Sequence, residues 1–227
     1  MRTAWLLAAV LVITTACSTT QQVAVRENPT ICAFLGDNCT ELTKGSEGQF
    51  GLRWVNPQAN LTQYNKVIVN VVGFFGSDVK KVPPKDQETL TALFQKELVE
   101  ALSKRFEVVE EPGPGVMRLQ VALLDAEAAT PGLRTISMVI PQARLLSTIS
   151  RGITGKYPFT GGSEAAGKIT DSVSGEILGI AADRRIGGGS IRTAGQWQWG
   201  DAENVIKEWS QMAADRIYAY TSGAAKP

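Results

Sequence analysis

Three carboxylates lie around a predicted hairpin, at Asp171, Glu176 and Asp183. Two carboxyl groups held near one another can serve as general acid and general base in a hydrolytic reaction. The alternative is an exposed ladder of cross-strand ion pairs, which stabilises a hairpin slightly and carries no chemistry. We expect the ladder. The basic residues available to it are Lys168, Arg184 and Arg185.

Nucleophilic catalysis has few candidate residues in this chain. The 227 residues include no histidine, which excludes Ser-His-Asp and Cys-His constellations and histidine-based metal sites. A serine hydrolase would then need a Ser-Lys pair, and the local candidates are Ser163 with Lys168 and Ser103 with Lys104. Neither pair lies in a recognisable motif, so we expect surface polar residues there and a protein that is not an enzyme.

A run of glycines in RIGGGS, at residues 187–189, invites comparison with phosphate-binding loops. Such loops place a lysine after the last glycine and open a helix, and neither feature follows here. We therefore expect an irregular loop after a hairpin strand.

Cys32 and Cys39 close a short loop in TICAFLGDNCTEL. In an oxidising compartment they would form a disulfide, worth about 2–3 kcal/mol in the chain-entropy description. The alternative is a pair of free buried thiols. Zinc usually takes four ligands, which two cysteines without histidine do not supply. We expect no metal and no cofactor.

The first sixteen residues have the layout of a secretory signal peptide, with Arg2 ahead of a short apolar run from Trp5 to Ile13. The residues around Cys17 resemble a bacterial lipobox, whose cysteine receives acyl chains such as palmitate and becomes the N-terminus. Ser18, in place of aspartate, implies the outer membrane. We expect a lipoprotein anchored by Cys17 at the periplasmic face of that membrane. Ordinary cleavage near Ala16, giving a soluble exported protein, is the alternative.

The composition, 44% hydrophobic and 20% charged, is typical of a folded domain. Without Arg2, the only charged side chain before Cys17, 22 basic side chains balance 22 acidic ones. A neutral chain without a basic block gives no electrostatic basis for binding nucleic acid. The expected parts are a signal peptide (1–16), a tether and partly ordered segment (17–62), a periplasmic domain (63–222) and a disordered tail (223–227).

Apolar periodicity predicts an α+β domain, with a mixed, mostly antiparallel sheet and two amphipathic helices packed on one face. Residues 66–72, a β-branched run with almost no polar alternation, indicate a central strand buried on both faces. The other expected strands are 106–110, 116–123, 165–171 and 176–183, and the expected helices begin near Asp86, as N-cap, and Asp201.

Two stretches could bind a partner. Residues 135–150 carry a single charge and could form an apolar docking patch, although core packing is the alternative. In QWQW, Trp197 and Trp199 would share one strand face and could stack on a sugar or a protein. A lid over the core is the alternative there. The candidate contact residues in the first stretch are Leu145, Leu146 and Ile149.

Three segments carry a family resemblance: YNKVIVNVVGFF, FEVVEEPGPGVMRLQVALLDAE and DSVSGEILGIAADRRIGG. With the closing amphipathic helix around Trp209, they resemble a family of bacterial lipoproteins, domain of unknown function 3313, over most of residues 50–220. The resemblance implies an exported lipoprotein and supplies no catalytic residues. We expect a non-enzymatic module that interacts with an envelope protein or assists envelope assembly. The alternative is a periplasmic module that binds a small ligand or a glycan.

Overall fold

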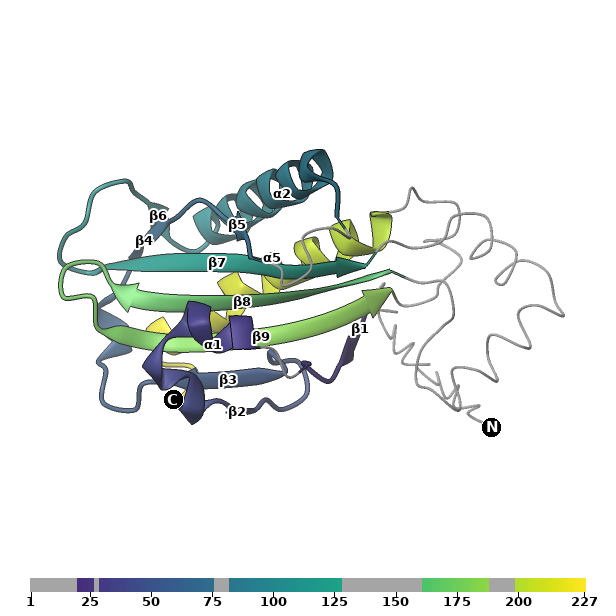
Figure 1. Ribbon diagram of the computed structural model, residues 1–227. Helices are drawn as coiled ribbons and strands as arrows, with labels where there is room; N and C mark the ends of the chain where they lie inside the picture. Colours follow the sequence, from purple (N-terminus) through teal and green to yellow (C-terminus); the bar gives the residue numbers. More distant parts are fainter. Residues whose placement is uncertain (1–19, 27–28, 76–81, 128–160, 188–198) are drawn as a thin grey trace, which may run out of the picture.

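The computed structural model describes residues 20–26, 29–75, 82–127, 161–187 and 199–227, which form one sheet with helices on both faces (Figure 1). The signal peptide, Cys17, the 135–150 stretch and Trp197 lie outside the described residues. Within the described part of the chain, none of the helices has both the length and the hydrophobicity needed to cross a bilayer.

Nine strands build the sheet, with β2-β3-β9-β8-β7-β4-β6 as its main order. β1 also pairs with β9, and β5 with β7. β4 runs parallel to β6 and β7, and β5 runs parallel to β7; the remaining pairs are antiparallel. The predicted mixed, mostly antiparallel sheet is confirmed. The strands are β1 Thr20–Val23, β2 Thr43–Lys44, β3 Leu52–Val55, β4 Lys66–Val69, β5 Gly73–Phe74, β6 Glu107–Val108, β7 Val116–Glu127, β8 Gly162–Asp171 and β9 Ile177–Gly187.

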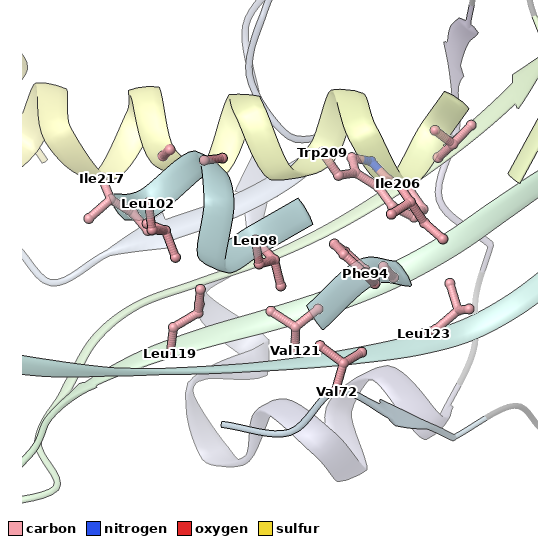
Figure 2. Packing of buried hydrophobic residues seen from close by; sticks show 14 of the residues in the cluster. Val72, Phe94, Leu98, Leu102, Leu119, Val121, Leu123, Ile206, Trp209 and Ile217 are labelled. Atoms are coloured by element: carbon pink, nitrogen blue, oxygen red, sulfur yellow. The ribbon is translucent and has the colours of Figure 1, made fainter. Parts of the chain in front are cut away.

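Helices α2 (Pro84–Ser103) and α5 (Gly200–Thr221) cover one face of the sheet, as the apolar periodicity predicts. Figure 2 shows Phe94 and Leu98 of α2 pointing toward Val121 of β7. Trp209 of α5 stacks on Phe94, with ring centroids 5.9 Å apart. The main hydrophobic core therefore lies between these two helices and β7.

The short helix α1 (Pro29–Leu35) covers part of the opposite face, where Ile31 and Leu35 pack with Ala122 and Ile180 (Figure 1). The predicted disulfide between Cys32 and Cys39 is present. It ties α1 to the 3₁₀ helix Asp37–Glu41 that follows, so the bond fixes the cover on this face.

The N-terminal region differs from the expected tether. Residues 20–23 form β1, and residues 52–55 form β3, and both strands pair with β9. The sequence TQQV carries no apolar alternation, and its pairing uses backbone groups that every non-proline residue possesses. The described sheet therefore begins at Thr20, well before Tyr64.

The predicted hairpin at residues 172–175 is confirmed, and Asp171 organises it. Its Oδ1 accepts hydrogen bonds from the amides of Val173 (2.9 Å) and Ser174 (2.7 Å), and its Oδ2 accepts one from the Tyr64 hydroxyl at 3.0 Å. The Ser174 amide is the largest cause that lowers the pKa of Asp171 below its ordinary value. Burial is the largest cause that raises the pKa of Tyr64.

The Asp171 carboxylate should make the hairpin sensitive to acid. Because the folded-state pKa is depressed, its stabilising effect is present above about pH 4, the ordinary aspartate pKa, and is lost as the pH falls through the folded value. We expect Asp171→Asn to lower stability at neutral pH and to match the wild type at strongly acidic pH. Urea unfolding at several values between about pH 2 and pH 7 measures the free energy of unfolding of both proteins. A difference between them that does not change with pH would contradict the prediction.

Candidate functional site

An apolar cavity of about 140 Å³ lies between the helix-facing side of the sheet and helices α2 and α5. Leu98 and Trp209 close it from the helices, and Val121 and Ile169 line it from the sheet. An engineered apolar cavity of about this size stays dry and binds benzene. The space therefore suits an apolar group of a few carbon atoms.

The cavity exists because four inward positions of β8 and β9 carry small residues. In the antiparallel register, Gly167 lies opposite Ala181, and Ile169 opposite Gly179. A Cβ added at Gly167 would meet its nearest atoms at 3.6 Å, an ordinary contact, so the backbone there has room for a side chain. The small residues are Ala165, Gly167, Gly179 and Ala181.

Two half-buried arginines form part of the cavity lining, Arg53 from β3 and Arg216 from α5. Arg53 donates to the Tyr220 hydroxyl at 2.8 Å, and Arg216 Nε donates to the Gly48 carbonyl at 3.1 Å. Neither guanidinium forms an ion pair with a carboxylate of the described residues. Both therefore keep capacity for an anionic group.

Beside the cavity, Asp183 is only 2% exposed and accepts four hydrogen bonds. Its Oδ1 accepts from Gln22 Nε2 at 2.6 Å and from the Gly51 amide at 2.7 Å. Its Oδ2 accepts from Arg185 Nε at 2.9 Å and from Trp209 Nε1 at 2.7 Å. A carboxylate has about four lone-pair positions, and here all are used. Asp183 thus joins β1, the start of β3, β9 and α5.

Arg185 extends this buried polar network. Its guanidinium also donates to the Glu208 carboxylate of α5, which in turn accepts a hydrogen bond from the Thr20 hydroxyl. Arg185 and Thr20 are 7% and 4% exposed. The network fixes the first residues of the described chain to the C-terminal helix.

The expected exposed ladder is therefore wrong, because β9 lies inside the sheet and is covered by α5. Asp183 and Arg185 are buried on the helix side, while Arg184 is buried on the other face, 3.8 Å from Glu164. Glu176 is exposed and accepts from Asn56 Nδ2 at 2.9 Å. The three carboxylates of the predicted hairpin thus have separate partners and form no acid–base pair.

The candidate Ser-Lys pairs are also not brought together for catalysis. Ser163 and Lys168 lie on opposite faces of β8, because their positions differ by an odd number in a regular strand. Ser163 donates to its neighbour's carbonyl, and Lys168 donates to the Phe34 carbonyl at 3.0 Å. Ser103 donates to the carbonyl of Glu100, whose side chain pairs with Lys104.

Trp199 lies in the core, where it is 2% exposed. Its Nε1 donates to Asp86 Oδ2 at 2.9 Å, which joins the start of α5 to the first turn of α2. Asp86 is not the N-cap of α2 as predicted, because the helix begins at Pro84 and Pro83 occupies the N-cap position. A ring covered in this way offers no face for stacking on a sugar.

The first glycine of the RIGGGS run has a packing role. A Cβ on Gly187 would lie 2.4 Å from Asp201 Oδ1, so only glycine fits without rearrangement. Asp201 is fully buried and accepts from the Gly161 amide at 2.9 Å. Among the residues that the structure describes, no group of cysteine and acidic side chains is arranged to hold a metal ion.

Several solved structures match this chain at low similarity. They include the PelC dodecamer of Paraburkholderia phytofirmans (10% identity, 70% of this chain and 95% of that chain, TM-score 0.38). Protein XCC0632 of Xanthomonas campestris, from family DUF330, matches at 10% identity over 75% of this chain and 93% of its own (TM-score 0.40). A neuraminyllactose-binding hemagglutinin homologue of Helicobacter pylori matches at 10% identity, over 74% and 95%, with a TM-score of 0.32.

No curated protein sequence matches this chain. The family model described as "Protein of unknown function (DUF3313)" matches residues 33–213, which include the end of α1, β2 to β9, α2 and most of α5. The match includes Asp183, Cys39 and most of the residues that line the cavity. The chain therefore belongs to the DUF3313 family.

Proposed function

We propose that this DUF3313 protein is a lipid-anchored, non-enzymatic module of the bacterial envelope that binds a small anionic amphiphile. The cavity between the sheet and α5 is the observation that carries the proposal. The lipid anchor is Cys17, and the membrane is the outer membrane at its periplasmic face. The lipobox-like residues around Cys17 support this placement.

The ligand class follows from the lining of the cavity. The apolar walls favour a hydrocarbon group, which gains about 0.8 kcal/mol for each buried methylene. Arg53 and Arg216 favour a carboxylate or phosphate beside that group, because guanidinium forms paired, charge-assisted hydrogen bonds with planar anions. A fatty acid or a related single-chain amphiphile fits both requirements.

The buried carboxylate at the cavity supports binding rather than catalysis. A general base needs a free lone pair within reach of a substrate proton. Asp183 already accepts four hydrogen bonds from the protein. Its arrangement is that of a structural acceptor, which holds the walls of the cavity in place.

Hexanoate titration tests the proposal, with Trp209 as a reporter inside the cavity wall. We expect saturable binding, and weaker binding of hexanol, which has the same chain and no charge. Ala181→Leu fills the space; it should weaken hexanoate binding at least tenfold and raise the free energy of unfolding by about 1 kcal/mol. Replacing both Arg53 and Arg216 by glutamine should weaken hexanoate binding without affecting hexanol binding.

The matched control is Val173→Leu, which adds bulk at a hairpin position that is 68% exposed. It should bind hexanoate as the wild type does. Gly167→Ala provides a second, smaller filling if Ala181→Leu packs poorly. Full-strength hexanoate binding by both filled variants would contradict the cavity as the site.

The predicted envelope protein partner stays a prediction. Four of its candidate contact residues lie outside the described residues, and the fifth, Trp199, is buried. The four are Leu145, Leu146, Ile149 and Trp197.

A further inference from the structure

We infer that one defined end of the sheet rests against the bilayer that holds Cys17. The near end, as we name it, is formed by Thr20 of β1, Gly162 of β8, Gly187 of β9 and Gly200 of α5. The inference rests on the proposed lipid anchor and adds to it the surface that faces the lipid.

The elements meet at the near end because of the sheet register. Thr20 pairs with Gly187, and Gly162 pairs with Ile186. The amide of Gly161 donates to Asp201, in the first turn of α5. Figure 1 shows the tips of β7 and β9 and the starts of β8 and α5 on one side of the molecule.

β1 begins only three positions after Cys17, so the chain between lipid and sheet is very short. Consecutive Cα atoms are 3.8 Å apart, which limits the separation of Cys17 and Thr20 to about 11 Å. β7, with 12 residues, extends for about 36 Å along the sheet. The link is thus several times shorter than the body that it holds.

Thr20 is fixed to that body and does not extend the link. Its side chain is 4% exposed, and its hydroxyl donates to Glu208. Arg185 Nη1 donates to the same hydroxyl at 3.4 Å. Gln22 Nε2 donates a hydrogen bond to Asp183 Oδ1 at 2.6 Å. The lipid would therefore hold the near end itself, and not a loose tether, at the headgroups.

The end of β7 and the start of β8 also lie at the near end, because Glu127 pairs with Gly162 there.

The experiment uses the full lipidated protein in vesicles of phosphatidylethanolamine and phosphatidylglycerol that carry a nitroxide on the headgroup. A fluorophore is placed by Lys85→Cys, near the start of α2, or by Val173→Cys, at the opposite hairpin. Both positions are exposed, and the Asp86–Trp199 hydrogen bond places the start of α2 beside the near end. We expect quenching at position 85 to exceed that at position 173 at least threefold.

A flexible linker of about 30 Gly/Ser residues inserted after Ser18, spanning about 30 Å on average, serves as the matched control. It should keep the protein on the vesicles and reduce quenching at position 85 to the level at position 173. Equal quenching at both positions without the linker, or unchanged quenching with it, would overturn the inference. A wild-type protein that does not float with vesicles would instead refute the lipid anchor.

Discussion

Replacement of Asp183 by asparagine is expected to lower the free energy of unfolding by about 3–5 kcal/mol, the range for breaking a buried charge pair. Each carboxylate oxygen accepts two hydrogen bonds from the protein. The asparagine amide places a donor against two other donors, and the Arg185 guanidinium loses one of its two carboxylate partners. Since a domain of this kind has a total stability of about 5–15 kcal/mol, the variant should be close to unfolding.

Asp215→Asn is the matched control for this substitution. Asp215 lies on the exposed side of α5 and pairs with Arg105 at 3.3 Å, with both side chains about half exposed. Such a pair contributes about 1 kcal/mol or less. Urea unfolding followed by tryptophan fluorescence measures both variants. If Asp183→Asn unfolds at the same urea concentration as Asp215→Asn, the buried network does not hold the fold together.

Replacement of Cys17 by serine is expected to move the protein from the membrane fraction to the soluble fraction almost completely. A bound acyl chain of sixteen carbons contributes on the order of 10 kcal/mol to membrane binding, at about 0.8 kcal/mol per methylene. Serine lacks the thiol to which the proposed diacylglycerol would be attached.

Fractionation of cells and labelling with a radioactive or clickable fatty acid measure this effect. The matched control is Cys32→Ser with Cys39→Ser, which removes the disulfide and should leave the label and the membrane fraction unchanged. Continued labelling and membrane recovery of Cys17→Ser would contradict the proposed anchor.

The helices and most of the sheet could be predicted because their apolar residues follow regular spacings. Leu90, Phe94 and Leu98 repeat at helical intervals, and all three are buried in the core. The hairpin was predictable from Gly175, whose φ of 76° lies in the left-handed region that glycine adopts most easily. These signals are local, and the structure confirms them.

The buried polar network could not be predicted from local pattern. Asp183, Arg184 and Arg185 are three consecutive charged residues, which usually indicate an exposed strand. Their burial depends on β1 and on Glu164 and Glu208, which lie far away in the sequence. The burial of Arg184 and Arg185 requires acidic partners, which are Glu164 and Glu208. The spacing of these residues along the sequence does not show that they pair.

The cavity also depends on distances that sequence periodicity does not contain. Gly167 and Ala181 read as ordinary strand residues, and only the paired register of β8 and β9 makes them neighbours. Whether a helix closes over such positions depends on the size of Trp209 and Leu98 above them. The volume is a result of tertiary packing.

The antiparallel pairing of β1 with β9 has a mechanical consequence. Tension between an anchored Cys17 and the domain would act at Thr20, along the axis of the strand. In this geometry the four paired positions from Thr20 to Val23 share the load and must slide together, whereas peeling from a strand end would break them one at a time. We expect the attachment to resist shear when the envelope is stretched.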